Sequence, residues 1–308
     1  RSCLLHFFSA AGLLIACSLS AGSASGDVTI EMVTVGDPGN APSAEGLGAV
    51  PYTYGIGVYE VTIGQYAEFL NAVAAKDAYG LYNTMMASNA NVAGIERSGS
   101  TGSHRYRVIG SALRPITYVS WWDAARFCNW LHNGQESGST EEGAYPLAGA
   151  VDGIPPKASP GAKFTIPTEA EWYKAAYYKG GSKNAGYWTY ATRSDEPPSN
   201  SRDGGVNQAN YRRAGVFCST QSGDFLSSEP YLTDVGTFSG SPSPYGTFDQ
   251  QGNVQEWNDL TGISDPARGL RGGSWYQGLF FLTFRNAAST PTYENSSTGF
   301  RVVSPVVE

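Results

Sequence analysis

Charged residues are scarce in this chain. Asp, Glu, Lys and Arg make up 15% of its 308 residues, against about a quarter in an average soluble protein. The formal net charge of -7 argues against binding to the phosphate backbone of nucleic acids. Hydrophobic residues still reach 41%, which is enough for the core of one large domain or two small ones. The surface is therefore expected to rely on Ser, Thr, Asn and Gly.

Long apolar stretches are confined to the N-terminus. After residue 26 no run of about 18 apolar residues is present, so the body has no membrane span. Residues 4–19 are apolar and small, which predicts a signal peptide over 1–26. Cleavage near Ala24 would release a secreted protein. Alternatively, the sequence LIAC resembles a bacterial lipobox in which Cys17 carries a lipid anchor. Either alternative predicts a bacterial protein that is secreted, periplasmic or on the cell surface.

Cysteine is rare as well. Only Cys128 and Cys218 follow the predicted signal peptide. They could form one disulfide in an oxidising compartment. Cys128 lies on the apolar face of a predicted helix, however, and is expected to be buried there as a small hydrophobic residue. The sequence leaves the pairing open.

Capping boxes predict helices at three places. In each, a Ser or Thr is followed three residues later by Gln, Asp or Glu, and the two side chains can bind the first free N–H groups of a helix. Apolar residues then recur at helical spacing, as Tyr66, Phe69 and Leu70 do after the first box. Trp121 and Trp122 are expected to belong to the core rather than to a binding surface. The boxes are Thr62–Gln65, Ser120–Asp123 and Thr168–Glu171.

The rest of the chain predicts one loop-rich α+β domain over residues 51–304. It would lie between an extended lead-in at 27–50 and a short tail at 305–308. Loops this long are usually functional or held by something else, and 7 Trp and 19 Tyr could hold them by packing. Short strands are expected at 54–61, 106–109 and 116–119, and long loops at 77–104, 133–162 and 180–246.

Six sequence blocks follow one another between residues 52 and 303. They read YEVTIGQYAEFLNAV, RPITYVSWWDAARFCNWL, FTIPTEAEWYKAAYY, YGTFDQQGNVQEWNDL, RGLRGGSW and GFRVV. In this order and spacing they resemble the formylglycine-generating enzyme (sulfatase-modifying factor) family. The resemblance implies a single α+β domain related to C-type lectins, with little regular secondary structure and often with bound calcium.

This chain differs from the family at the residues that carry out the family's reaction. Active members use oxygen to oxidise a cysteine of a sulfatase to formylglycine, and two of their own cysteines hold copper(I). Those cysteines follow the Gly-Gly-Ser triplet by three and eight residues, which corresponds here to Gln277 and Leu282, or to Thr283 if the segment is one residue shorter. Thiolate is the reactive form of cysteine and a soft ligand that suits copper(I). Copper is therefore not expected, and the comparison implies a pseudoenzyme with no catalytic residues of this kind.

The same resemblance implies a ligand cleft in the last third of the chain. Trp257, Ser274, Arg285 and Ser297 would line it, and Gln277 joins them as a candidate. Alternatively, Trp257 and the neighbouring Trp275 are core aromatics, and Arg285 is the partner in a buried ion pair.

The resemblance also implies calcium sites. In the first, backbone carbonyls of Gln251, Gly252 and Val254 would combine with the Glu256 carboxylate, since calcium takes six to eight oxygens in irregular geometry. Alternatively, Glu256 pairs with an arginine or caps a turn. A second, weaker site lacks an acid at Gly236, where characterised family members have Asp. Its ligands would come from Asn210, Tyr211, Gly236 and Phe238.

Two functions are compatible with these observations. The first is an extracytoplasmic binding or structural module for a ligand or protein that the sequence does not name. The alternative is an oxidoreductase or other enzyme of the same family that uses the cleft without the cysteine pair. The ending SPVVE resembles the start of a Val-Pro-Glu-Pro surface-sorting tail, and display at the cell surface is expected if the native protein continues into such a tail.

Overall fold

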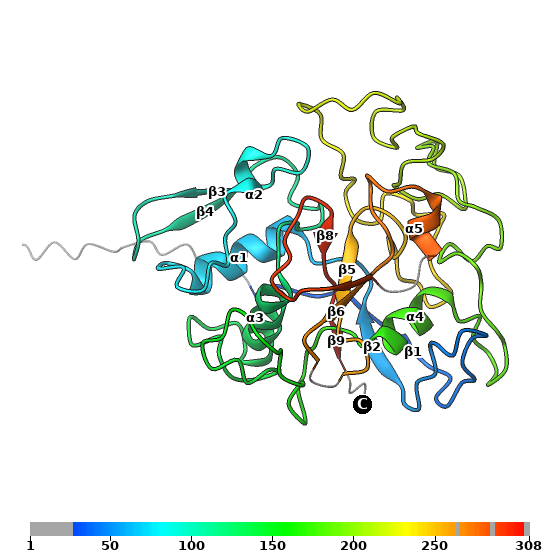
Figure 1. Ribbon diagram of the computed structural model, residues 1–308, viewed down its shortest axis with the longest axis horizontal. Coiled ribbons are helices and arrows are strands. Elements are labelled where there is room, and N and C mark those ends of the chain that lie inside the picture. The colour runs from blue at the N-terminus through cyan, green and yellow to red at the C-terminus, as the bar shows by residue number, and fades with distance from the viewer. Residues whose placement is uncertain (1–26, 263–264, 284–286, 305–308) are drawn as a thin grey trace, which may run out of the picture.

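Few regular elements, joined by long loops, make up the fold (Figure 1). The structure, a computed structural model, describes residues 27–262, 265–283 and 287–304. The predicted signal peptide, Cys17 and the tail at 305–308 lie outside these residues. The helices are α1 (Ile63–Val73), α2 (Met85–Ser88), α3 (Trp121–His132), α4 (Glu169–Tyr177) and α5 (Leu279–Thr283). The strands are β1 (Met32–Val35), β2 (Tyr54–Gly57), β3 (Ile95–Ser98), β4 (Arg105–Val108), β5 (Gln255–Asn258), β6 (Arg268–Arg271), β7 (Ala287–Ser289), β8 (Thr298–Gly299) and β9 (Val303–Ser304).

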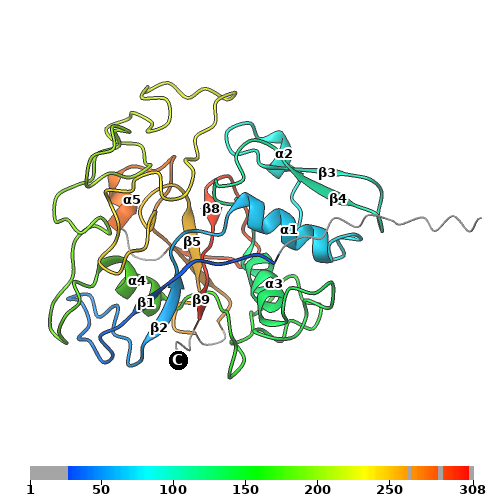
Figure 2. The ribbon, with the colours of Figure 1, turned by 180° about the vertical axis from the view of Figure 1, so that it is seen from behind.

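Strand pairing joins the two ends of the domain. The described strands form sheets in the orders β1-β2-β9, β3-β4 and β7-β6-β5-β8. Ile56 of β2 lies opposite Val33 on one side and Val303 on the other. Gln255 of β5 pairs in parallel with Thr298 of β8. The predicted lead-in thus supplies β1 and belongs to a sheet, and the segment before β1 runs toward α1 and α3 (Figure 2).

The three predicted capping boxes are present at the starts of α1, α3 and α4. In α1, for example, the Gln65 N–H donates to Thr62 Oγ1 at 3.3 Å and the Thr62 N–H donates to Gln65 Oε1 at 2.9 Å. The apolar faces of α1 and α3 meet through aromatic rings, with the Phe69 and Phe127 centroids 5.4 Å apart. The core interpretation of Trp121 and Trp122 is confirmed, because both side chains are buried.

The expected strand at residues 116–119 is wrong. Tyr118 has a φ of +58°, a left-handed conformation that an extended strand does not contain. The backbone there binds two distant segments instead: the Ile116 N–H donates to the Val61 carbonyl and the Tyr118 N–H to the Asn295 carbonyl, each at 2.9 Å. The expected loop at 77–104 also contains α2 and β3.

Both body cysteines are free and buried. Cys128 lies in α3 within the main core, as expected, and Cys218 follows Phe217 in a loop, so the alternative of a disulfide between them is not realised. Within the described part of the chain, none of the helices has the length and apolar character that a membrane crossing requires.

Candidate functional site

The Gly-Asn-Val-Gln-Glu-Trp motif forms the turn into β5 and is packed against residues 208–211. Gly252 has a φ of +83°, and a Cβ there would lie 2.2 Å from the Asn210 carbonyl oxygen, so only glycine fits. The Asn253 N–H donates to that carbonyl at 2.7 Å. The two predicted calcium-binding segments are therefore adjacent, which the sequence alone did not indicate.

Glu256 pairs with an arginine, as the alternative interpretation held. Arg301 Nε and Nη2 lie 2.6 Å and 2.8 Å from its two carboxylate oxygens. Trp172 Nε1 donates to the same carboxylate at 2.8 Å. Both members of the pair are 0% exposed, so the interaction is a desolvated, bidentate ion pair.

Two further acids lie beside this pair, and the sequence analysis missed both. Glu60 accepts hydrogen bonds from Asn253 Nδ2 at 3.0 Å and from the Val254 N–H at 3.2 Å. Burial, with added repulsion from Asp249 and Glu256, raises the pKa of Glu60 well above its usual range. Burial likewise raises the pKa of Asp249 to about 6. The charge of Arg301 acts in the opposite direction and lowers the pKa of both acids, so Glu60, Asp249 and Glu256 form one buried group with this arginine.

The hydrogen bonds of the Asn210 side chain indicate whether these residues could bind calcium. Its Nδ2 donates to the Tyr231 carbonyl at 2.9 Å and to Asn253 Oδ1 at 3.1 Å. Its Oδ1 is buried and, among the described residues, receives no hydrogen bond. An oxygen left without a donor is what a calcium ligand requires, so the Asn210 site fits the ion. At the first predicted site Glu256 is already engaged by Arg301 and Trp172.

A small polar cavity of about 10 Å³ has one residue of each predicted calcium site in its lining, Phe238 and Gln251. Gln208 Oε1 is a second buried acceptor for which the described chain offers no donor. Asp249 receives the Gly236 N–H at 2.6 Å and supplies an acid close to the position where the sequence has none. In the described part of the chain no three His, Cys, Asp or Glu residues form a metal cluster, so any ion here would depend on amide and carbonyl oxygens. The cavity lining includes Gln208, Phe238, Asp249 and Gln251.

The Gly-Gly-Ser-Trp segment leads into α5 and positions Gln277 and Leu282, the two residues that the sequence analysis predicts in place of cysteines. Ser274 is fully buried, and its Oγ lies 3.3 Å from Gln277 Oε1. Leu282 is 1% exposed and packs with Ala209 and Tyr211. The Leu282 carbonyl accepts a hydrogen bond from Tyr177 at 3.1 Å. One position therefore presents an amide and the other a packed aliphatic side chain.

Within the described structure, the side chains of the other predicted cleft residues bind elsewhere than to Ser274 and Gln277. Trp257 is 0% exposed and its Nε1 donates to the Val119 carbonyl at 3.0 Å, as expected of a core aromatic. Ser297 is half-buried, and its Oγ donates to Asn295 Oδ1 at 3.1 Å. Trp275 is buried in a separate aromatic cluster. Arg285 lies outside the described residues.

Both free cysteines have raised pKa values, which disfavour their thiolate forms. Burial, with a smaller effect of the nearby Asp259 charge, raises the pKa of Cys128 well above its ordinary value. Burial raises the pKa of Cys218 to about 12. Since the thiolate is the nucleophile and the copper ligand, both cysteines are inert near neutral pH.

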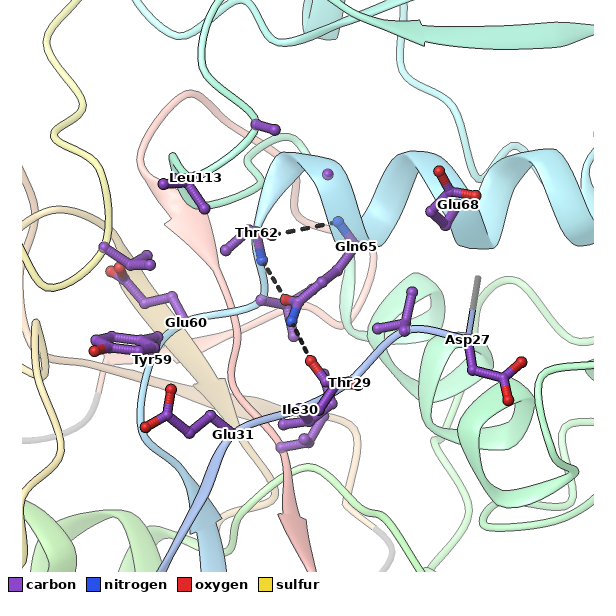
Figure 3. Close-up of a pocket in the computed structure, with 16 residues that line it drawn as sticks. Asp27, Thr29, Ile30, Glu31, Tyr59, Glu60, Thr62, Gln65, Glu68 and Leu113 are labelled. Carbon is purple, nitrogen blue, oxygen red and sulfur yellow. Dashed lines mark hydrogen bonds between the residues drawn. The ribbon is translucent and has the colours of Figure 1, made fainter. Parts of the chain in front are cut away.

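An acidic cavity of about 620 Å³ lies beside the start of α1 (Figure 3) and includes Glu60 in its lining. Asp27, Glu31, Glu60 and Glu68 line it together with Tyr59. The N-terminus of α1 offers no anion site there, because its first N–H groups already donate to the carbonyls of residues 114 and 112 at 2.8 Å and 2.9 Å.

Comparison with known proteins agrees with the observed architecture. The model of the sulfatase-modifying factor enzyme 1-like domain matches residues 39–306. Among solved structures, CarF is similar with a TM-score of 0.56 and 23% identity, over 91% of this chain and 99% of that one. Treponema denticola variable protein 1 is similar with a TM-score of 0.51 and 20% identity, over 91% and 97%. A search of curated proteins finds no match. At these identities the structural likeness concerns the fold alone.

Proposed function

Because the chain belongs to the sulfatase-modifying factor family, we propose that it is a binding or structural module without that family's cysteine oxidase reaction. The predicted fold class, a loop-rich α+β domain related to C-type lectins, is confirmed. We further propose that the protein acts outside the cytoplasm, as the N-terminal signal pattern indicates.

The proposal rests on the packing of the Leu282 side chain. By spacing from Gly-Gly-Ser this residue takes the place of the second working cysteine, and its side chain is packed into a small apolar cluster with Ala209 and Tyr211. Gln277, in place of the first, is hydrogen bonded to Ser274. An amide and an isobutyl group offer copper(I) no soft ligand. Cys128 and Cys218 lie on other segments as buried, protonated thiols and do not substitute.

A peptide assay tests the proposal directly. The purified protein is incubated with a Cys-x-Pro-x-Arg peptide, oxygen and copper(I), and the peptide mass is followed. We expect no formylglycine, while an active family member converts the peptide under the same conditions. Clear turnover by this chain would overturn the proposal.

A cavity of about 580 Å³ that reaches α5 is the best place for a ligand of the module. It is lined by rings of Tyr173, Tyr177 and Trp188, with Arg271 in its wall and Thr283 at its α5 side. Aromatic walls with a few polar groups are the usual character of small-molecule sites.

The same cavity gives the alternative, an enzyme of different chemistry, a place to act. Metal titration separates the two functions. Stabilisation by calcium alone supports the module, whereas a redox metal bound next to α5 supports an enzyme.

We also propose that calcium binds where the two predicted segments meet. Asn210, Tyr211, Gly236 and Phe238 would hold it on one side, and the carbonyls of Gln251, Gly252 and Val254 on the other. The Glu256 carboxylate is not counted as a ligand, because it is engaged by Arg301 and Trp172. The acceptor oxygen of Asn210 that receives no hydrogen bond from the described residues supports this placement.

A further inference from the structure

A polar cavity of about 450 Å³ lies between loop segments that are distant in the sequence. We term it the Arg114 cavity. Its volume is ordinary for a small-molecule site, roughly 300–1,000 Å³. None of the predicted cleft residues lines it, so it is separate from that cleft. The side chains that carry its chemistry are Arg114, Arg202, Ser219, Thr220, Glu229 and Asp234.

Side-chain amides hold the walls of the Arg114 cavity in place. Asn91 Nδ2 donates to the carbonyls of Leu226 and Glu229 at 2.9 Å and 2.7 Å. Next to Ser219 in the sequence, the Cys218 carbonyl accepts a hydrogen bond from Gln221 Nε2 at 2.9 Å. The cavity is thus formed before any ligand arrives, which lowers the entropic cost of binding.

Two guanidinium groups in this cavity form no ion pair within 4.0 Å among the described residues. Arg114 is partly buried, and no carboxylate or carbonyl among the described residues accepts from its side chain. Arg202 makes one long hydrogen bond, 3.5 Å from Nη1 to the Ser219 carbonyl. By contrast, Arg126 and Arg301 each form bidentate pairs at 2.6–2.9 Å. Since a guanidinium stays charged and matches oxyanions in geometry, both cavity arginines are suited to bind a carboxylate.

Two hydroxyl groups in the same wall also have no partner. Ser219 Oγ and Thr220 Oγ1 are shielded from solvent, and in the described structure neither takes part in a hydrogen bond. A buried hydroxyl without a partner is unfavourable. A ligand oxygen entering beside them would supply the partner after a small side-chain rotation.

Two carboxylates from residues 229–234 also line the cavity, and they form no ion pair with these arginines. Glu229 and Asp234 line it, yet the ion pairs within 4.0 Å in the described chain include neither them nor Arg114 and Arg202. The cavity therefore contains both cationic and anionic side chains that are not paired with each other. A ligand with one positive and one negative group could bind to both kinds.

We propose that the Arg114 cavity binds a free α-amino acid. Arg114 and Arg202 bind its carboxylate, with Ser219 and Thr220 as additional donors, and Glu229 and Asp234 accept from its ammonium group. The volume leaves space for a side chain. This inference extends the binding role proposed above by naming a ligand class and a second site for it.

Calorimetry and thermal shift with single L-amino acids test the inference. We expect at least one of the common amino acids to bind, and acetate and methylamine, each carrying one charge, to bind far more weakly. R202Q and the double variant E229Q/D234N should each weaken binding about ten-fold or more, because each loses charge-assisted hydrogen bonds. R105Q, an exposed arginine on β4 that does not line the cavity, is the matched control and should bind like the native chain.

Three results would overturn the inference: no amino acid binds, acetate binds as tightly as the best amino acid, or R202Q binds unchanged. R202Q removes an exposed side chain, so loss of folding does not obscure its reading, and R114Q is added if it folds. The peptide assay is independent of this experiment. Turnover there would refute the proposed function and leave the Arg114 cavity untouched, whereas absent amino acid binding would refute only this inference.

Discussion

Leu282 occupies a packed position, and by its spacing from Gly-Gly-Ser we propose that it replaces a reactive cysteine of the family. It is almost fully buried, and its Cδ2 lies 3.0 Å from where a Cβ on Gly273 would stand. We therefore predict that Leu282→Ala lowers the free energy of unfolding by about 2–5 kcal/mol, the usual cost of such a cavity. Gln277→Ala, in contrast, should change it by about 0.5 kcal/mol or less, because Gln277 is only half-buried.

Urea denaturation of both variants checks this contrast. Equal, small effects would mean that Leu282 is not part of the packing and that the segment is free to rearrange. That result would weaken the view that α5 is a structural element here.

At the scale of single residues, the sequence indicated which positions matter but not what they contact. The motif around Glu256 was recognised, and its pairing with an arginine was one of two alternatives. The partner, Arg301, comes 45 residues later. Glu60 is 194 residues from the Val254 N–H that it accepts. Such contacts depend on how the sheets close, and a local pattern does not contain that information.

The first turn of α3 contains an acid whose charge conflicts with its surroundings. Asp123 accepts from the Ser120 N–H at 2.8 Å and is buried. Burial, followed by the nearby charge of Glu294, raises the pKa of Asp123 to about 7, against the lowering effects of Ser120 and Arg126. The protonated acid is therefore favoured in the folded state, and its contribution to stability is lost as the pH rises from about 4 through about 7.

Asp123→Asn should remove this pH dependence, because the amide still accepts the Ser120 N–H but cannot ionise. We predict that the stability of the variant relative to the native chain rises by on the order of 1–3 kcal/mol between pH 5 and pH 8. Urea midpoints at the two pH values measure it, with the exposed Asp152→Asn as control. A difference that stays constant with pH would show that Asp123 keeps its charge throughout.

At the scale of elements, the three capped helices were predictable and the strands only in part. The strands expected at 54–61 and 106–109 correspond to β2 and β4, whereas the one expected at 116–119 is absent. A capping box lies within four residues, so the local sequence is enough to predict where a helix begins. The boxes at Thr62, Ser120 and Thr168 predicted α1, α3 and α4 in this way. Strands of two to four residues carry little periodicity. Residues 116–119 alternate like a strand, yet the left-handed Tyr118 turns the chain there toward Asn295.

At the scale of the molecule, side-chain amides replace regular structure over much of the second half. Between α4 and β5 the described chain has isolated bridges but no helix or strand. Asn200 Nδ2 donates to the Val216 carbonyl at 2.8 Å, and Asn210 and Asn253 join three loop segments. This explains how a chain with few charges and no disulfide between its body cysteines keeps long loops ordered. In a domain built from such loops, a bound cation would have a large effect on stability, because one ion would hold several loops together.

Calcium removal should therefore destabilise the whole domain. A ligand present at about 100 times its Kd stabilises by about 2.7 kcal/mol, so we predict that EDTA lowers Tm by roughly 5 °C and that added calcium restores it. Magnesium should not substitute, because it demands a smaller, regular octahedron of ligands. Asn210→Leu removes the acceptor oxygen and should abolish most of the calcium-dependent increment, whatever it does to Tm itself. Asn184→Leu, an exposed control, should keep the increment. If EDTA leaves Tm unchanged, or if Asn210→Leu retains the full increment, the loops are held by the amide network alone and the proposed ion site is wrong.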